Sequence, residues 1–364
     1  GPVEVRMSTE TRTGWKPLHL AVAHIPGPTP HAPYVLAGGH LDSWHFGGTD
    51  NAGANVAMLE LARGFARHQG QLLRGLVVAW WPGHSNGRYA GSTWFVDQFF
   101  DELRRNALAY VNFEGLGQME AKRFGAAATS SLAGLARSVV LDGTGESIRP
   151  YHPGRNSDQS FNGVGLPLLQ LNHSRLAEDG GYWWWHTPED TRDKVDAAVL
   201  KTDADLYAAA LARLLAEPVF PVTPAAAVER LGGLLEERQE EAGSHLDLAE
   251  AIQRQDELLN VTRRLEASLP SEHDPEIDLA LVAILRPLHR VLYTNLGPYH
   301  PDPAVTLGAL PGLNALEMLA DNDPDTDRYR FALATLRREE ARILEAIDLA
   351  QNRAEDLLGR LTDR

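Results

Sequence analysis

The stretch Tyr34-Val-Leu-Ala-Gly-Gly-His-Leu-Asp42, followed by the polar loop Gly47-Gly-Thr-Asp-Asn51, decides the fold class of this chain. Its first five residues form an apolar run, which is typical of a buried strand. The segment at 53–68 then places apolar side chains at helical spacing, at Val56, Leu59, Ala62 and Phe65. The order strand, polar loop, helix predicts one unit of a parallel sheet.

The same order repeats along the first half of the chain. Further apolar runs that predict strands lie at 76–80, 109–113 and 166–171. Helical patterns lie at 92–105, 130–141 and 194–215. Continuous apolar strands separated by helices predict an α/β fold, with a mostly parallel mixed sheet sandwiched by helices. We assign this fold to a first domain at residues 1–217.

The second half differs because we find no strand pattern in it. The Pro-rich segment at 217–224 is typical of a linker. Long, charged segments with high helix propensity follow at 225–240, 245–268, 275–293 and 326–361. A loop rich in Pro and Gly lies at 295–312. We therefore predict an all-α helical bundle domain over residues 218–364.

Composition and charge exclude several classes of protein. The net charge of −15 at pH 7 argues against binding to nucleic acid or to an anionic membrane surface. No apolar run approaches the ~20 residues of a membrane helix. The chain has no cysteine, so any metal must be bound by His, Asp or Glu, and a reducing compartment such as the cytoplasm is favoured. The chain begins Gly1-Pro2 without methionine, which leaves open whether native residues precede it.

Four potential metal ligands lie next to the predicted strands and helices. They are His40 after the first strand, Asp50 in the polar loop, Glu114 at the end of the 109–113 strand, and His186 before the last helix of this half. Loops at strand ends are where a rigid sheet usually presents functional groups. Asp42 is placed to orient a ligand without binding the ion itself. Each residue alone also fits a structural role, such as a helix cap for Asp50, but their coincidence favours a metal site.

These segments resemble the co-catalytic zinc peptidases, which include bacterial aminopeptidases, glutamate carboxypeptidases and the transferrin receptor. Segment 39–44 is similar to the family's His-x-Asp-Ser ligand segment, and segment 48–53 to its bridging-aspartate loop. Glu114 stands where the family has a metal-binding Asp, segment 156–161 resembles its Ser-Asp-x-x-x-Phe stretch, and segment 186–191 resembles its last ligand segment. The resemblance covers residues 35–215 and implies two divalent metal ions, zinc in that family.

One segment departs from the family's pattern. The family carries Glu-Glu after the second strand, and the first Glu is the general base while the second binds one ion. This chain reads Trp81-Pro-Gly-His-Ser-Asn-Gly87 there. In a comparison without gaps, His84 occupies the family's position for the general base. After a shift by one residue, it occupies the position for the metal ligand. We favour His84 as a ligand, since imidazole binds zinc as readily as a carboxylate does.

The resemblance then implies two ligand sets that share Asp50. The first ion would be bound by His40, Asp50 and Glu114, and the second by Asp50, His84 and His186. A different group would then act as the general base, and the candidates are His45, Glu189 and, if it is not a ligand, His84.

Substrate contacts are suggested by three further residues. Arg155 is a candidate to hold a substrate carboxylate through two hydrogen bonds, although an isolated Arg more often lies on the surface. Tyr182 and Trp185, in the stretch Tyr182-Trp-Trp-Trp-His186, are candidates for an apolar substrate wall, although large aromatics more often belong to the core.

We therefore predict a metal-dependent hydrolase that cleaves a peptide or another small amide with metal-activated water. Loss of the Glu-Glu pair also fits an alternative, a catalytically inactive receptor-like or scaffold homodimer on the same fold. The stretch at 285–316 resembles the helical dimerisation domain of the carboxypeptidase and transferrin-receptor branch, which implies a homodimer through the C-terminal half. Neither a Gly-x-Gly-x-x-Gly turn nor a basic stripe supports binding of dinucleotides or nucleic acid.

Overall fold

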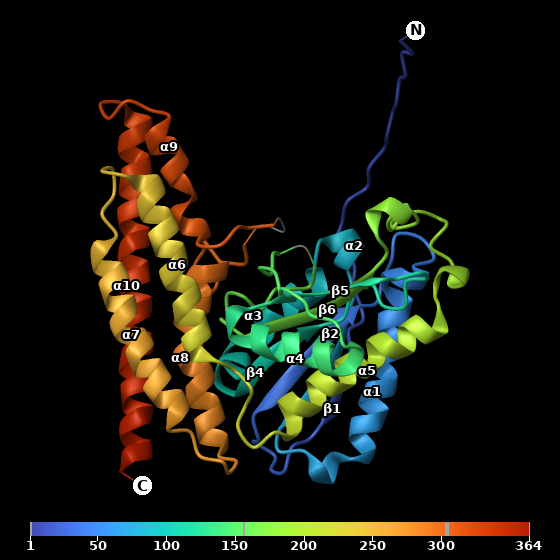
Figure 1. Cartoon of the computed structure of the whole chain (residues 1–364). Helices are drawn as coiled ribbons and strands as arrows, with labels where there is room; N and C mark the ends of the chain where they lie inside the picture. Colours follow the sequence, from blue (N-terminus) through green and yellow to red (C-terminus); the bar gives the residue numbers. More distant parts are fainter. Residues whose placement is uncertain (1, 156, 303–305, 364) are drawn as a thin grey trace.

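A six-stranded sheet with the strand order β1-β3-β2-β4-β6-β5 forms the centre of the first half (Figure 1). The computed structural model describes residues 2–155, 157–302 and 306–363. The strands are β1 (Ala21–Ile25), β2 (Tyr34–His40), β3 (Gly75–Trp81), β4 (Ala107–Asn112), β5 (Arg123–Ala128) and β6 (Leu168–Ser174). β3, β2, β4 and β6 run parallel to one another, and β1 and β5 pair antiparallel at the two edges. The parallel strands confirm the four apolar runs of the sequence.

The sequence patterns did not predict the two edge strands, β1 and β5. Most positions of β1 are exposed or half-buried, so it lacks the apolar run of a central strand. β5 reads Arg-Phe-Gly-Ala-Ala-Ala and contains no β-branched residue, so its local preference is for helix. Both strands form because a neighbouring strand offers unpaired backbone groups, which is a tertiary effect.

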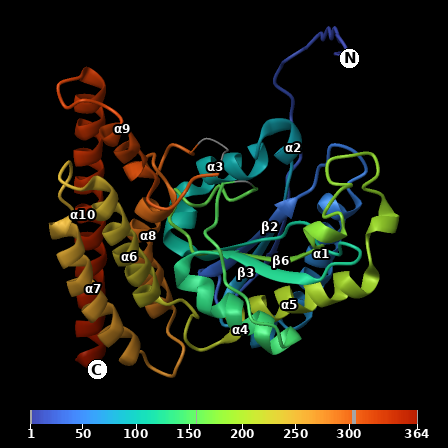
Figure 2. The same ribbon diagram turned by 45° about the horizontal axis from the view of Figure 1, so that its top comes forward.

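Helices cover both faces of the sheet. α1 (Gly53–Arg67), α4 (Ala133–Thr144) and α5 (Ala197–Ala216) pack on one face, and α3 (Ala90–Asn106) packs on the other (Figure 2). The single turn α2 (His84–Gly87) lies between β3 and α3. Since β2, β3 and β4 are parallel neighbours, their carboxyl ends meet at one edge of the sheet, where the loops of the predicted site begin.

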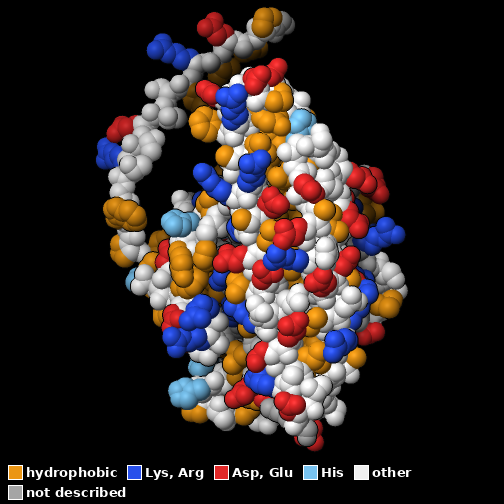
Figure 3. Space-filling model, turned by 90° about the vertical axis from the view of Figure 1, so that its left-hand side faces the viewer, with side chains coloured by type: hydrophobic (Ala, Val, Ile, Leu, Met, Phe, Trp, Pro, Cys, Tyr) orange, Lys and Arg blue, Asp and Glu red, His pale blue; other side chains and the backbone are white. Residues whose placement is uncertain are grey.

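The second half is helical, as predicted. Its helices are α6 (Pro224–Ala242), α7 (Ala249–Ala267), α8 (Pro275–Tyr293), α9 (Leu316–Ala320) and α10 (Asp327–Thr362). α10 packs along both α7 and α8, and the bundle stands beside the sheet in Figure 1. Acidic and basic side chains are interspersed over its outer face (Figure 3). Arg254 of α7 pairs with Asp348 of α10 at 2.7 Å. Among the described residues, the helices are too short or too polar to cross a membrane.

A buried ion pair joins the two halves. Arg74 is fully buried before β3, and its Nε and Nη2 donate to the Asp278 carboxylate of α8 at 2.6 and 2.8 Å. Arg74 also donates to the carbonyls of Glu217 and Pro218 in the connecting segment. Arg286 of α8 donates to two carbonyls on the path from α3 into β4. Because the apolar core continues across this boundary, the predicted division into two domains stays a prediction.

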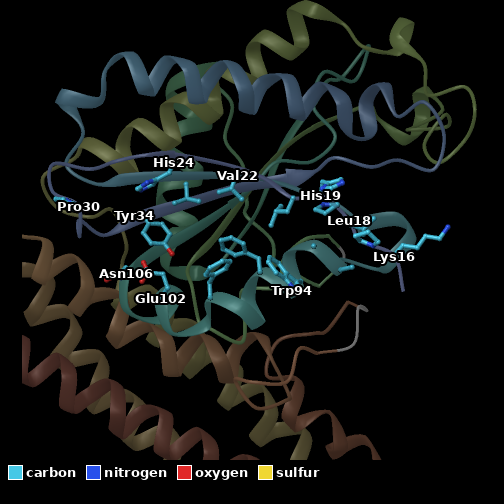
Figure 4. A pocket seen from close by; sticks show the side chains of 18 of the residues that line it. Lys16, Leu18, His19, Val22, His24, Pro30, Tyr34, Trp94, Glu102 and Asn106 are labelled. Carbon is cyan, nitrogen blue, oxygen red and sulfur yellow. The ribbon is translucent and has the colours of Figure 1, made fainter. Parts of the chain in front are cut away.

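An apolar groove of about 1050 Å³ runs between β1, the N-terminal segment at 15–20 and α3. Side chains of β1, such as Val22 and His24, face Trp94 of α3 across it (Figure 4). None of the predicted metal ligands lines this groove, so the candidate site lies elsewhere, at the carboxyl ends of the strands.

Candidate metal centre

His40 is the centre of a buried cluster at the end of β2. Its Nδ1 lies 2.7 Å from the backbone oxygen of Asp42 and therefore donates to it. Its Nε2 faces two carboxylates, at 2.8 Å from Asp50 Oδ1 and 3.0 Å from Glu114 Oε1. Glu114 reaches this point because β4 pairs with β2 and ends beside it. The other oxygen of Glu114 accepts a hydrogen bond from Ser157.

The loop that carries Asp50 is held by buried polar side chains. The carboxylate of Asp190 accepts from the backbone N–H groups of Thr49 and Asp50 at 2.9 and 3.0 Å, and from the Thr49 hydroxyl at 2.8 Å. The side chain of Asn51 donates to the Phe113 carbonyl at the end of β4. Asp50 therefore has a fixed position relative to both Glu114 and the loop of His186.

His186 lies on the opposite side of Asp50 from His40. Its Nε2 is 3.1 Å from Asp50 Oδ2, so the two oxygens of Asp50 face two different imidazoles. The His186 ring is stacked between Trp185, at 3.8 Å between ring centroids, and Trp44, at 5.0 Å. This stacking orients the ring, although the φ of His186 is +58°, a value that side-chain-bearing residues rarely adopt.

His84 lies with His40 and Glu114, whereas the sequence predicted it beside His186. One ligand atom from each of these three residues lies within 4.8 Å of the others, and the rings of His40 and His84 stack at 3.8 Å. His84 Nδ1 is 2.7 Å from Asp158 Oδ2, and among the described residues no hydrogen bond is made to Nε2. The Asp42 carboxylate accepts from the backbone N–H groups of His84 and Ser85, so it positions α2.

The pKa shifts reflect the crowding of carboxylates around His40. Burial acts to lower the pKa of His40, but the carboxylates of Glu114 and Asp50, which both face its Nε2, raise it well above its usual range. Burial acts to raise the pKa of Glu114, but the charge of His40 and the hydrogen bond from it lower this pKa to about 2. Each shift shows that the pair favours opposite charges in the same small volume.

The donor set fits a divalent cation. Asp50 Oδ1 is buried and, despite its distance to His40, makes no hydrogen bond of good geometry with any described residue. A buried carboxylate oxygen without a donor is unfavourable, and a cation between Asp50, His40 and Glu114 would relieve this. Imidazole and carboxylate ligands without thiolate are typical of zinc and similar ions in catalytic sites.

The other predicted site residues are exposed to solvent or support the cluster from outside. His45 is exposed, and the hydrogen bond described at this residue is from Ser43 to its backbone carbonyl. Glu189 is also exposed. The hydroxyl of Tyr182 is bonded to Thr49 at 2.5 Å, so it supports the Asp50 loop, while Trp185 is half exposed beside His186.

Arg155 lies away from the metal cluster. It is buried, and its two terminal nitrogens donate to the Asp302 backbone carbonyl and to the Thr93 hydroxyl. It lines a separate cavity of about 140 Å³, together with Tyr299 and His300 of the second half. Asn156, the next residue along the chain and the first of segment 156–161, lies outside the described residues.

Sequence reasoning gave no role to Asp158 and Asp190, the two buried carboxylates that hold the cluster in place. Both occur in stretches quoted above, Asp158 in segment 156–161 and Asp190 in segment 186–191. The sequence carries no direct signal for their partners, because His84 precedes Asp158 by 74 residues and Thr49 precedes Asp190 by 141.

Comparison with known proteins gives a consistent result. The sequence model described as Peptidase family M28 matches residues 21–211. The chain is 24% identical over 213 residues to "Probable glutamate carboxypeptidase AMP1" of Arabidopsis thaliana, which covers 53% of this chain and 29% of that protein. It is 23% identical over 253 residues to "Glutamate carboxypeptidase 2 homolog" of Caenorhabditis briggsae, which covers 59% of this chain and 32% of that protein. The chain thus spans about a third of the length of these curated relatives.

Among solved structures, the chain is similar to BSAP, a zinc aminopeptidase from Bacillus subtilis. The two are 19% identical, and the alignment covers 54% of this chain and 49% of that one with a TM-score of 0.47. An aminopeptidase from Aneurinibacillus sp. strain AM-1 gives 22% identity, coverage of 55% and 50%, and a TM-score of 0.47.

Proposed function

Because this chain belongs to peptidase family M28, whose model matches more than half of its length, we propose that it is a metal-dependent hydrolase of a peptide or another small amide bond. The observation that carries the proposal is the position of Asp50 between two imidazoles. Its Oδ1 is 2.8 Å from His40 and its Oδ2 is 3.1 Å from His186, an arrangement suited to a carboxylate that bridges two cations.

We assign His40, Asp50 and Glu114 to one ion, and Asp50 and His186 to the other, and zinc is the metal that the family favours. When bound, such a pair of ions polarises a carbonyl group and lowers the pKa of water. The chain's own residues bind the ions and hold them close to the half-exposed indoles of Trp44 and Trp185, which form an apolar wall next to His186.

We assign His84 the role of proton acceptor. The first ion would already have three protein ligands, His40, Asp50 and Glu114. A fourth would fill the coordination position that catalysis needs for water or substrate. Asp158 holds Nδ1 of His84, the ring lies against that of His40, and no described residue makes a hydrogen bond to Nε2. His84 Nε2 would therefore take the proton of the attacking water and pass it to the leaving amine, which replaces the carboxylate base of the family.

Metal analysis with point variants tests this assignment. We expect about two zinc ions per chain after reconstitution, as in two-metal hydrolases, and strong loss of both in Asp50→Ala. His84→Ala should keep the metal and lower the rate on cleaved amides by ~10²–10⁴-fold, and His45→Ala, on an exposed neighbour, should change neither quantity.

Three outcomes would change the proposal. Loss of one ion in His84→Ala would make His84 a ligand. Stoichiometric metal without cleavage of any amide in a broad screen would support the inactive scaffold. Absence of stoichiometric metal in the parent protein would end the hydrolase proposal.

We also propose that two copies of the chain pair through the helical half. Three apolar side chains on α9 and α10 are exposed, Met318, Phe331 and Leu349. Sedimentation of the parent chain should give the mass of a dimer, and Phe331→Glu should shift it to the monomer. A monomeric parent at micromolar concentration would exclude a stable dimer.

A further inference from the structure

The ring of His84 is enclosed by groups that the sequence did not connect with it. The ring of His40 stacks on it, with 3.8 Å between the ring centroids. The ring of Tyr89 makes a T-shaped contact with it, with 4.9 Å between the centroids. Nδ1 of His84 meets Asp158, which is completely buried. Packing therefore fixes where the ring lies, but packing alone does not decide which of its two nitrogens carries the hydrogen.

A chain of hydrogen bonds leads to Asp158, the partner of His84 Nδ1. Ser92 Oγ lies 2.7 Å from Asp158 Oδ1, and Ser160 Oγ lies 2.9 Å from Ser92 Oγ. Thr93 Oγ1 is 3.2 Å from Ser160 Oγ, and Arg155 Nη2 is 2.9 Å from Thr93 Oγ1. A guanidinium only donates and an ionised carboxylate only accepts, so each hydroxyl in between donates toward Asp158.

The direction of this chain has a consequence for His84. Since an ionised Asp158 is an acceptor on both oxygens, the hydrogen between it and His84 belongs to Nδ1 of the imidazole. Nε2 is then the unprotonated nitrogen of a ring that stacks on His40 and has one nitrogen within 4.8 Å of ligand atoms of His40 and Glu114. Successive bonds that point the same way strengthen one another in a medium of low dielectric constant.

We propose that Asp158 is a positioning residue, which holds His84 in the tautomer with Nδ1 protonated and Nε2 free, and that Ser92, Ser160, Thr93 and Arg155 keep Asp158 in place. This inference deepens the function proposed above and depends on it for its catalytic meaning. It also explains why Arg155 is buried away from the metal cluster.

The far end of the chain lies in the second half of the molecule. Arg155 Nη1 donates to the backbone carbonyl of Asp302, whose carboxylate accepts from the N–H groups of Asn295 and Leu296 after α8. The segment that follows α8 is thus connected to His84 through hydrogen bonds and the covalent frame of Asp302. The helical half is in this way a part of the candidate site.

The tautomer of His84 can be measured without metal or substrate. In metal-free protein labelled with ¹⁵N-histidine, the two ring nitrogens of each neutral imidazole have distinct shifts and couplings. The resonance of His84 among the 14 histidines is the one that disappears in His84→Gln. We expect the parent to show protonated Nδ1 and bare Nε2, and Asp158→Ala to show mostly the opposite tautomer or a mixture.

Two variants complete the test. Asp158→Asn keeps the side-chain shape and one acceptor oxygen, so it should restore the parent tautomer in part, whereas Asp97→Ala, on an exposed residue of the same cavity as Arg155, should leave it unchanged. With zinc bound, Asp158→Ala should lower kcat by ~10–100-fold with little change in KM, as expected for groups that orient a functional imidazole.

The outcomes separate this inference from the proposed function. Protonated Nε2 in the parent would overturn the inference, and this result needs no variant that folds. A parent-like tautomer in folded Asp158→Ala would overturn it as well. If the parent binds no metal and cleaves no amide, the proposed function fails, while the tautomer measurement still decides the role of Asp158.

Discussion

Replacement of Asp190 by alanine tests the link between the buried carboxylates and the metal centre. Asp190 is 2% exposed and accepts three hydrogen bonds, from the backbone N–H groups of Thr49 and Asp50 and from the Thr49 hydroxyl. Its removal leaves two buried backbone donors without an acceptor. Because Asp50 bears one of these donors, the carboxylate that we propose to bridge two ions loses its support at the same time.

The cost of the change can be worked out from these bonds. Each buried backbone donor left unsatisfied costs about 1–3 kcal/mol, so the two together cost roughly 2–6 kcal/mol. Alanine also leaves room in which a water molecule can replace part of the lost bonding. We therefore expect the free energy of unfolding to fall by about 3 kcal/mol. Zinc affinity should fall by ~10–100-fold, the usual effect of losing a group that orients a ligand.

Urea unfolding of the metal-free protein, followed by tryptophan fluorescence, measures the free energy of unfolding. Competition with a zinc-binding dye measures the zinc affinity. Asp193→Ala is the matched control, since Asp193 lies three residues further along the same loop, is exposed, and bonds only to Thr191 and Lys194 among the described residues. The control should change the free energy of unfolding by less than ~0.5 kcal/mol. If Asp190→Ala behaves like the control in both assays, the argument that Asp190 holds the Asp50 loop is refuted.

Three further predictions concern stability. Asp278→Ala leaves the Arg74 guanidinium buried without its carboxylate and should cost about 3–5 kcal/mol of unfolding free energy in urea, whereas Glu276→Ala, exposed on the same turn, should cost little. Burial lowers the pKa of His289 to about 3. Below pH ~6.5 the unfolded chain therefore takes up a proton that the folded chain does not, and the free energy of unfolding decreases as the pH is lowered. This loss should reach about 2 kcal/mol at pH ~5 and be absent in His289→Phe; an equal pH slope in both proteins would contradict it. Chelation of zinc held at ~100 times its Kd should remove about 2.7 kcal/mol of stability, seen as a lower thermal midpoint, and an unchanged midpoint would mean that the folded chain binds no zinc.

Much of the fold follows from local patterns. The parallel strands were predicted because each is buried on both faces and therefore reads as an apolar run, as in β2 and β4. The helices of the second half were predicted because charged residues with high helix propensity surround a regular apolar face. β1 and β5 escaped prediction since their preference for a strand comes from the neighbour with which they pair.

For the site, the chain order alone identified His40, Asp50, Glu114 and His186 as a group, because each follows a strand or precedes a helix at one edge of the sheet. Their convergence on Asp50 in the structure is consistent with that prediction, and metal binding by them remains the proposal to test. The position of His84 beside His40, and the distance of Arg155 from the cluster, came only from the structure.

What the sequence determined by itself is therefore the kind of site: a sheet edge supplied with imidazoles and carboxylates, and no thiolate. These properties depend on residue type and on local periodicity, which a single chain shows directly. What only the tertiary structure decided is which nitrogen and which oxygen each residue presents. Asp158 and Asp190 make hydrogen bonds to residues 74 and 141 positions away, and such contacts exist only after the sheet has brought the loops together.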